Sequence, residues 1–468
     1  MLRPTQLCLD DSILSIADIA INPEAVADLI PWELFEPVRV KYEKARFEHL
    51  KKETKKKNGE VKPRRGRPPK CAHKLFYIAE EELEDCRDEE PGIGGAPAYD
   101  FYCLLYAFLI APLYDCEANS ESIWRELARN PGFVRACCFD PAEVPSVSTL
   151  KRFNRIMSDE DLWGEISTIT VENNIELGII ENTGTLVVDP THHDGFASVK
   201  KPVKECRECK RLKHCKDVVY TCDVTDIVAK SSNYKLPGVK SVPVSLAGSE
   251  IPIAAMALNA RAFDGKSLED TLSFVKGRYP DLKIDTVMAD GAFNSADNRK
   301  IAGEVMNADL VTPVCPRRNK KKKVSARGID HVNTYGVPVC AQGHRMELLG
   351  RDEKRGQYIW GCPVYHPSRS DETLTCEKKR ECSPASRNGR VYRTNADEFP
   401  QVNWEFPQHS RRHKKLYAMR TQIERIISRV KRMLSFERFY ARGKKALQGF
   451  ADRYVTVFNI IAYAAWAI

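Results

Sequence analysis

The chain has 468 residues, 43% hydrophobic and 29% charged, so it can bury a sizeable core and is long enough for about three domains. This composition excludes wholesale disorder. The net charge of +9 is small for this length, but four basic stretches together carry +31 and leave the remainder acidic. Such concentrated positive charge favours a protein that binds the phosphate backbone of nucleic acid, the alternative being a solvated charged surface. The four stretches are residues 51–70, 200–216, 317–323 and 411–445.

The N-terminal part is predicted to contain a helical segment, a linker and a helical domain. Residues 1–50 have a helix start signal at Asn22-Pro23-Glu24, followed by apolar residues at helical spacing. Residues 51–95 form a Lys/Arg-rich linker with Gly and Pro, followed by an acidic stretch. Residues 96–165 carry apolar residues three and four positions apart, which predicts a compact all-helical domain.

The basic linker contains Arg64-Arg65-Gly66-Arg67-Pro68-Pro69-Lys70, which resembles an AT-hook. In this interpretation Arg65 and Arg67 follow the negative potential of a narrow A/T-rich minor groove, because Gly66 lets the backbone lie flat. A simple basic linker accounts for the same residues, so both interpretations stay open.

The middle of the chain has the pattern of an α/β sheet. Short apolar runs alternate with a helical pattern, which predicts strands separated by helices. Residues 311–409 break this alternation, since they are basic, contain cysteines and are rich in Gly and Pro, as is typical of an inserted module. A long helical pattern resumes near His413 and continues to the C-terminus, where residues 455–468 are too short an apolar run to span a bilayer. The apolar runs are Leu186–Val188, Ile251–Leu258 and Ile284–Ala289, and the helical run is Leu268–Val275.

Two aspartates end predicted strands. Asp189 follows Leu186–Val188, and Asp290 follows the run that ends at Ala289. Ligands of open α/β sheets bind beside the carboxyl ends of strands, so both carboxylates are candidate site residues. Asp is also an ordinary strand-terminating residue, so neither position is specific by itself.

A third acid lies on the predicted C-terminal helix among basic residues. Tyr417, Arg420, Glu424 and Lys431 are three, four and seven residues apart, which places all four on one face of a continuous helix. A separate apolar stripe can dock that helix on a sheet. The alternative is a surface ladder of salt bridges, because Arg420 and Glu424 are an i, i+4 pair. The stripe is Ile423, Ile426, Ile427, Val430 and Leu434.

Together these residues resemble the insertion-sequence DDE transposases, in the branch whose third acid lies in a Tyr-Arg-Glu-Lys signature. Asp189 stands in Val-Val-Asp-Pro-Thr, and Asp290 stands in Ala-Asp-Gly-Ala-Phe. Residues 101–157 are similar to the helical N-terminal domain of the same transposases. The signature is matched by Tyr417, Arg420, Glu424 and Lys431.

The resemblance implies a fold and a domain order. The fold is an α/β ribonuclease H-like catalytic domain, with an all-helical N-terminal domain and a Cys-rich insertion. The catalytic domain would comprise residues 180–310 plus 410–468, and residues 311–409 would be the insertion, with a zinc-binding role as a candidate. Residues 96–165 would serve DNA binding or assembly.

The resemblance also implies a catalytic site for two divalent metal ions. Asp189 would lie on the first strand, Asp290 after the fourth strand and Glu424 on the helix that follows the insertion. Three carboxylates supply the hard oxygen ligands that Mg²⁺ or Mn²⁺ prefers. Two such ions can activate a water or a 3′-hydroxyl for in-line displacement at phosphorus, so no protein nucleophile is needed.

The predicted function is a DNA transposase. It would bind the terminal inverted repeats of an insertion sequence as a homodimer or higher assembly on double-stranded DNA, hydrolyse the phosphodiester at each end, and join the freed ends to target DNA. Arg420 and Lys431 would contact phosphates, and Tyr417 would contact the backbone or a base. Two alternatives stay open: a ribonuclease H-like nuclease without strand transfer, and a zinc-containing DNA-binding regulator without enzymatic activity.

The sequence has 16 cysteines and shows no secretion signal at its start. We therefore expect the protein in a reducing compartment, the bacterial cytoplasm at the nucleoid, and without a membrane partner. Metal binding is then favoured over disulfides. Cys206, Cys209 and Cys215, with Cys222 and His214 nearby, have a spacing suited to Zn²⁺, the alternative being a redox-sensitive cluster. A second group has looser spacing, which leaves its zinc ligands open. It comprises Cys340, His344, Cys362, His366, Cys376 and Cys382.

Four further residues have two interpretations each. His192 and His193 could touch substrate or metal, but hydrogen-bonded structural histidines are the commoner case. Asp194 is open in the same way. Trp404 could stack on a flipped base near the site or pack in a core or interface.

Overall fold

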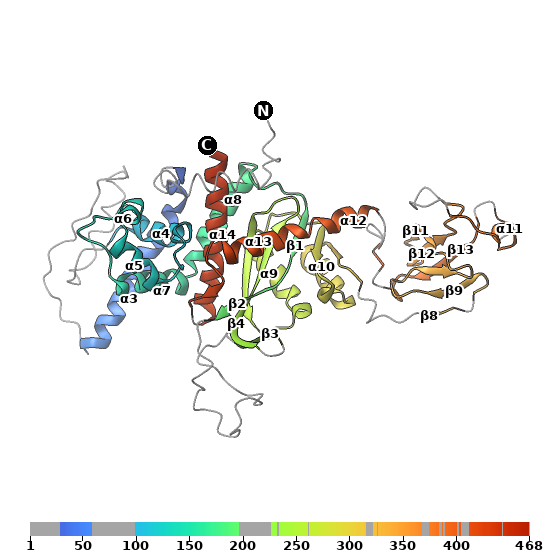
Figure 1. The fold of residues 1–468 in the computed structure, drawn as a ribbon, viewed down its shortest axis with the longest axis horizontal. Helices are drawn as coiled ribbons and strands as arrows, with labels where there is room; N and C mark the ends of the chain where they lie inside the picture. Colours follow the sequence, from blue (N-terminus) through green and yellow to red (C-terminus); the bar gives the residue numbers. More distant parts are fainter. Residues whose placement is uncertain are drawn as a thin grey trace, which may run out of the picture.

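The computed structural model describes residues 29–58, 99–195, 226–314, 322–366, 374–403 and 411–467, apart from short gaps within these ranges. Three parts follow one another along the long axis (Figure 1): helices at one end, a large sheet in the middle, and a small β module at the other end. Several candidate site residues lie outside the described residues. These are Arg65, Arg67, Cys206, Cys209, His214, Cys215, Cys222 and Trp404.

The N-terminal part is helical, and polar side chains cap several of its helices. Asp100 and Asn119 each accept hydrogen bonds from two backbone N–H groups of the helix that follows, as expected of N-cap residues. The first helix extends through Asn58, so the first eight residues of the predicted linker are helical, because a Lys-rich run without Gly or Pro favours a helix. The helices are α3 (Glu36–Asn58), α4 (Phe101–Ile110), α5 (Ser120–Arg129), α6 (Pro131–Ala136), α7 (Val147–Asp159) and α8 (Leu162–Glu176), with 3₁₀ turns η2 (Trp32–Phe35) and η4 (Ala111–Tyr114).

The central sheet contains the strands predicted from the three apolar runs, and Leu268–Val275 lies in a helix as predicted. One path through the sheet has the order β5-β4-β1-β6-β7, in which the first three strands are antiparallel and the last three are parallel. The elements are β1 (Thr185–Val188), β2 (Thr191–Gly195), β3 (Asp226–Ser231), β4 (Tyr234–Leu246), β5 (Pro252–Asn259), η5 (Asp264–Lys266), α9 (Leu268–Arg278), β6 (Thr286–Ala289), η6 (Gly291–Phe293), α10 (Ala296–Met306) and β7 (Asp309–Val311).

The longest strand of the sheet, β4, has no clear strand pattern in the sequence. Pro237, Gly238 and Pro243 lie within it, and proline and glycine ordinarily argue against a central strand. In the structure β4 nevertheless pairs with β5 on one side and with β1 and β2 on the other. Tertiary pairing therefore overrides local propensity here.

The prediction of one helix from His413 to the C-terminus is wrong. The chain forms α12 (Arg411–Ala418), α13 (Thr421–Arg432), a short strand β14 (Arg438–Phe439) and α14 (Lys444–Ala467). Bonds from the N–H of Arg420 to Tyr417 O and of Ile423 to Arg420 O tighten the chain between α12 and α13. Ser435, with φ of 55°, ends the helical path before β14.

One continuous hydrophobic core joins the helical part to the sheet. The C-terminal helix α14 is central to it, because it packs on α8 and α7 as well as on β5 (Figure 1). Its residues from Val455 to Ile461 are buried. None of the helices in the described ranges is both long and apolar enough to cross a membrane.

The β module has a small core of its own. Two three-stranded sheets make it up, and the structure pairs no strand of one with a strand of the other. The elements are β8 (Lys322–Lys323), β9 (Ile329–Val332), β10 (Pro338–Cys340), β11 (Glu347–Asp352), β12 (Gln357–Gly361), α11 (Lys379–Cys382) and β13 (Val391–Asn395).

Candidate catalytic site

Asp189 and Asp290 lie at the same end of two neighbouring parallel strands. The residues just before them, Val188 at the end of β1 and Ala289 at the end of β6, are directly paired. Asp189 interrupts what is otherwise one strand: β1 and β2 follow β4 in a single register, and Pro190 between them has no N–H for the ladder. The two carboxylates therefore emerge side by side at one edge of the sheet, as expected for ligand-binding residues of an α/β sheet.

Asp290, the second aspartate, stabilises the turn in the loop after β6. Asp290 caps the 3₁₀ turn η6, because its Oδ1 accepts a hydrogen bond of 2.8 Å from the N–H of Ala292. This bond fixes the carboxylate beside the strand end.

Arg420 links Glu424, the third acid, to Asp189, the first. Its Nη1 is 2.7 Å from Asp189 Oδ2, and its Nη2 is 2.7 Å from Glu424 Oε1. Arg420 occupies the N-cap position of α13, and Glu424 lies in the first turn of that helix. The predicted i, i+4 pair of Arg420 and Glu424 thus exists, but it is not an isolated surface ladder, since the same guanidinium also binds Asp189 on the sheet.

Burial and charge oppose each other at Asp189. Burial raises the pKa of Asp189 from 3.8 to about 6; Arg420 acts against this rise, whereas Asp290 and Glu424 add to it. The effect of both acids on the pKa shows that three carboxylates share one electrostatic environment. A perturbed carboxyl group among like charges at a strand end is typical of a functional site.

Gln422 holds α13 on the sheet, and the sequence analysis missed it. Its amide Nε2 donates to Ser245 Oγ (3.0 Å), Leu246 O (2.7 Å) and Ser249 O (2.9 Å), and its Oε1 accepts from Gly248 N (2.8 Å). Gln422 is 3% exposed. A polar residue directly beside the apolar stripe of α13 was the available signal, because a buried amide needs hydrogen-bond partners.

A buried acid at the other end of the same loop also orients α13. The carboxylate of Glu250, 15% exposed, pairs with Arg425 and lies 2.6 Å from Arg429 Nη1. The apolar stripe packs below: Ile423, Ile426, Val430 and Leu434 are buried and Ile427 is half-buried. Docking through this stripe and these polar contacts directs Glu424 toward Asp189.

Tyr417 also faces the carboxylates, although it belongs to α12. Its ring stacks on His413 with ring centroids 5.8 Å apart, and the Arg420 guanidinium carbon lies 5.8 Å from its ring centroid. Burial raises the pKa of Tyr417, Arg420 lowers it, and Asp290 and Asp189 raise it further. The tyrosine therefore lies within electrostatic range of two of the acids.

Lys431 lies against the strand that follows Asp189. Its Nζ donates to the carbonyl of His192 and is 3.7 Å from Glu437 Oε2. Lys431 is thus positioned beside β2, on the same helix as Glu424 but nearly two turns farther along it.

For His193 the structure favours a hydrogen-bonded structural role over contact with substrate or metal. His193 is 1% exposed, with Nε2 2.7 Å from Ser241 Oγ and Nδ1 2.9 Å from Phe436 O. His192 is half-buried, and burial lowers its pKa, with Lys240 adding to the effect. In Asp194 the backbone N–H donates to Glu437 O, which helps pair β2 with β14.

The donor set suits a hard divalent cation. Three carboxylates without sulfur or nitrogen ligands are what Mg²⁺ or Mn²⁺ binds in proteins. In this structure the Arg420 guanidinium supplies the positive charge between Asp189 and Glu424, and no three His, Cys, Asp or Glu side chains of the described residues are arranged to hold a metal ion.

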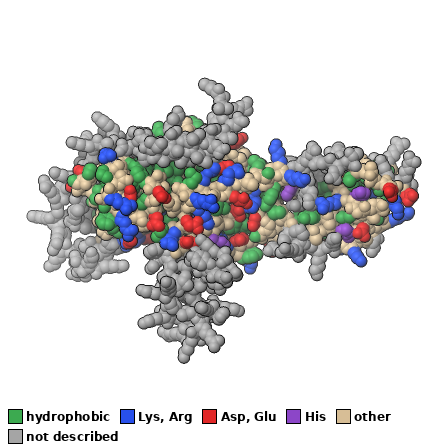
Figure 2. All heavy atoms as spheres, in the orientation of Figure 1, with side chains coloured by type: hydrophobic (Ala, Val, Ile, Leu, Met, Phe, Trp, Pro, Cys, Tyr) green, Lys and Arg blue, Asp and Glu red, His purple; other side chains and the backbone are tan. Residues whose placement is uncertain are grey.

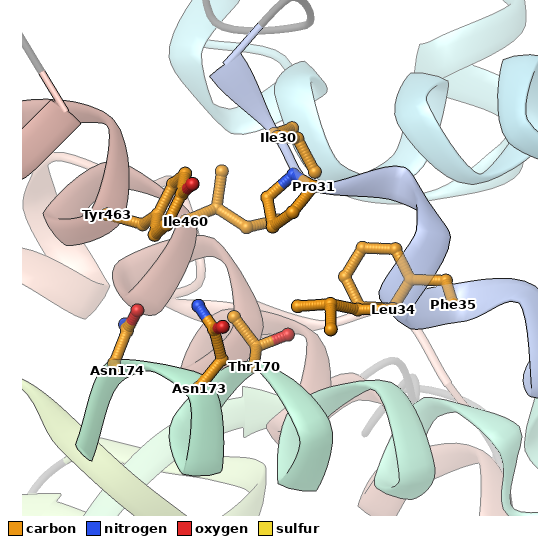
Figure 3. A pocket seen from close by; sticks show the side chains of 9 residues that line it. All are labelled: Ile30, Pro31, Leu34, Phe35, Thr170, Asn173, Asn174, Ile460 and Tyr463. Carbon is orange, nitrogen blue, oxygen red and sulfur yellow. The ribbon is translucent and has the colours of Figure 1, made fainter. Parts of the chain in front are cut away.

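One face of the molecule carries charges of both signs, since Lys and Arg side chains are mixed with Asp and Glu over its middle part (Figure 2). A small apolar pocket lies elsewhere, between η2, α8 and α14 (Figure 3), and none of the three acids lines it. Its lining residues are Ile30, Pro31, Leu34, Phe35, Thr170, Asn173, Asn174, Ile460 and Tyr463.

An α/β sheet with carboxylates at one edge and a basic helix docked across it is compatible with a ribonuclease H-like DDE domain. Residues 339–464 match the family model described as a transposase DDE domain. These residues are therefore similar to a transposase DDE domain, and the predicted resemblance to insertion-sequence DDE transposases is confirmed. No curated protein and no solved structure matches the chain significantly.

The matched segment starts in β10 of the β module and ends in α14, so it covers about a quarter of the chain. Glu424 lies within it, whereas Asp189 and Asp290 precede it. The Cys-bearing module from β10 onward is thus part of the matched family segment. The four residues of the Tyr-Arg-Glu-Lys signature lie within the matched segment. Their assignment to that signature stays a prediction.

Proposed function

We propose that this protein is a DNA transposase that binds the terminal inverted repeats of an insertion sequence, hydrolyses the phosphodiester at each end and joins the ends to target DNA. One observation carries the proposal. Arg420 links Asp189 on the sheet to Glu424 on α13, and Asp290 emerges from the strand paired with that of Asp189. This arrangement supports one site made by three acids far apart in sequence, in a chain of which residues 339–464 match a transposase DDE domain.

The topology supports a ribonuclease H-like catalytic domain. If β2 is counted as the continuation of β1, and β3, which pairs antiparallel with one end of β4, is left out of the count, the order of strands is 3-2-1-4-5, with β6 as the fourth. Asp290 then follows the fourth strand, which agrees with the position that the resemblance implies. The acid on α13 reaches the site only because this helix crosses the sheet (Figure 1).

The residues of the site would have two roles on DNA: some would bind metal, and others would bind phosphate. Asp189, Asp290 and Glu424 would hold Mg²⁺ or Mn²⁺, and the bound cations would lower the pKa of an attacking water or 3′-hydroxyl and stabilise the leaving oxygen. With metal held by the carboxylates, the Arg420 guanidinium would no longer be needed in its two ion pairs and would be available to bind a phosphate in bidentate fashion. Tyr417, beside Arg420, would pack against the DNA end.

The direct test replaces each acid in turn. Asp189→Ala, Asp290→Ala and Glu424→Ala should each abolish Mg²⁺-dependent cleavage of a duplex carrying the element's end while end binding persists. Glu269→Ala, which changes an exposed acid on α9, is the matched control and should cleave normally. Cleavage in a gel assay that survives in all three variants would overturn the site assignment.

A pre-nicked end distinguishes the proposed activity from its rivals. Joined products with target DNA are expected from a transposase. A nuclease of the same fold would cleave without joining, and a DNA-binding regulator would do neither.

A further inference from the structure

The β module has a small core. Nine apolar residues among those described are buried in it, and small domains of this kind ordinarily need a disulfide or a metal as a staple. The cysteines described in the module are free thiols. These thiols are therefore candidates for a link between the two sheets.

Four cysteines come from three different parts of the module. Cys340 ends β10 of the first sheet, and Cys362 directly follows β12 of the second sheet. Cys376 precedes α11, and Cys382 ends it. All four are half-buried.

Gly328 and Arg390 mark the place where three of these segments meet. The N–H of Ala341, next to Cys340, donates to Gly328 O at 3.1 Å. A Cβ atom on Gly328 would lie 3.5 Å from Cys382 Sγ and 3.5 Å from Arg390 Nε. The N–H of Cys362 donates to Arg390 O at 2.9 Å. Both sheets and α11 thus present a thiol to the same small region.

The backbone after two of the cysteines folds into tight turns. Gly343 N donates to Cys340 O at 2.8 Å, and Cys340 N donates to His344 O at 2.9 Å, in a turn that Gly343 permits with φ of 78°. After Cys362, the N–H of Tyr365 donates to Cys362 O at 3.1 Å, so the chain turns back directly after this cysteine.

We propose that Cys340, Cys362, Cys376 and Cys382 bind one structural Zn²⁺ as four thiolates and so fasten the two sheets of the β module together. Four sulfur ligands in tetrahedral geometry are a common structural zinc site. No three Cys, His, Asp or Glu side chains of the described residues surround a metal position, so in this assignment zinc binding would draw the thiols closer together.

The two neighbouring histidines are not ligands in this assignment. The His366 ring packs over Gly361, where its Cδ2 lies 2.8 Å from the position of a Cβ atom, and His344 closes the turn after Cys340 through its backbone carbonyl. The proposal concerns the stability of the module and does not depend on the proposed transposase activity.

Thiol alkylation of the full chain, mapped by peptide mass spectrometry, tests the site without any substitution. In protein purified with Zn²⁺, all four cysteines should resist the reagent, and a chelator should make all four reactive. Cys138, an exposed free cysteine of the helical part, is the internal control and should react equally in both conditions. Because each peptide is read separately, Cys206, Cys209 and Cys215 do not confuse the result. Alkylation of the four at the rate of Cys138 before chelation, or protection that persists after it, would overturn the proposal.

Metal analysis of variants supplies the second test. Cys362→Ser and Cys382→Ser should each lose one zinc ion per chain relative to the unchanged protein, whereas Cys138→Ser should lose none. Since a variant can lose zinc by misfolding, the full chain is also loaded with Co²⁺, which should give the absorption spectrum of tetrahedral tetrathiolate coordination. Unchanged zinc content in both variants, or a Co²⁺ spectrum without sulfur ligation, would contradict the assignment.

Discussion

At the scale of single residues, Arg420 controls the charge of the carboxylate cluster. It is bound to Asp189 and Glu424 at once, so it partly neutralises two acids that would otherwise repel each other and Asp290. Even so, burial prevails at Asp189 and raises its pKa to about 6. The site is therefore held together by a cation that belongs to the protein, the guanidinium of Arg420.

Asp189 should make the folded protein less stable as pH rises. Its pKa is 3.8 when unfolded and about 6 when folded, so the folded state holds the extra proton between these values. Between pH 4 and pH 7 we expect the unfolding free energy of the unchanged protein to fall by about 1–3 kcal/mol relative to Asp189→Asn. Urea denaturation without added divalent metal at both pH values measures the difference, and a parallel pH dependence in the two proteins would refute it.

At the scale of elements, the position of α13 decides whether Glu424 belongs to the site. Its apolar stripe fixes the side of the helix that meets the sheet. Gln422 and Glu250 fix its placement along the loop between β4 and β5. The break after α12 matters too, because it lets Tyr417 turn toward the carboxylates while α13 follows the sheet.

Gln422→Leu should impair cleavage more than DNA binding. The leucine has a similar volume but leaves the Gly248 N–H and several acceptors without their partner, at a cost of about 2–4 kcal/mol in stability. Since α13 then loses its placement, we expect cleavage of a DNA end to slow by about tenfold or more. The exposed Gln342→Leu is the control. Equal cleavage rates for the two variants would show that Gln422 does not position the site.

At the scale of the whole molecule, α14 makes the helical part and the sheet one body. Arg453 on this helix is 1% exposed and lies among three aromatic rings, 5.3 Å from the centroids of Phe108 and Trp163 and 4.6 Å from that of Phe450. It also donates to Ala118 O at 2.9 Å. Burial lowers its pKa to about 9, so a cation is kept there mainly by ring faces and one carbonyl.

Arg453→Ala should destabilise the whole protein. We expect a loss of about 2–4 kcal/mol, because the substitution removes the aromatic contacts and leaves a cavity. Arg453→Met should cost less than half as much, since it keeps most of the volume without a buried charge. Thermal unfolding followed by circular dichroism gives both values, and a methionine variant as unstable as the alanine variant would contradict the packing argument.

DNA binding should weaken steeply with salt, because the basic residues concentrate around the site. A protein that neutralises about six phosphates loses on the order of 10³ in affinity between about 50 and 200 mM salt. Replacing Lys414 and Lys415, exposed on α12, with alanine should reduce the slope, whereas Lys300→Ala on α10 should not. Fluorescence anisotropy of a labelled DNA end measures the slope. A flat salt response would count against phosphate binding by this surface.

The sequence by itself determined the strands that carry Asp189 and Asp290, the apolar stripe of α13 and the resemblance to the transposases. These are local features: a buried strand needs a short apolar run, and a docked helix needs apolar residues at helical spacing. Family signatures likewise depend on residue type and spacing alone.

Only the tertiary structure decided which residues meet. β4 forms despite two prolines because its neighbours on both sides supply pairing, which no local pattern records. The contacts of Arg420, Gln422 and Arg453 span more than 170 residues of chain, and the thiols of the β module converge through Gly328 and Arg390. Such contacts depend on how elements pack, because packing sets distances in space that spacing along the chain does not contain.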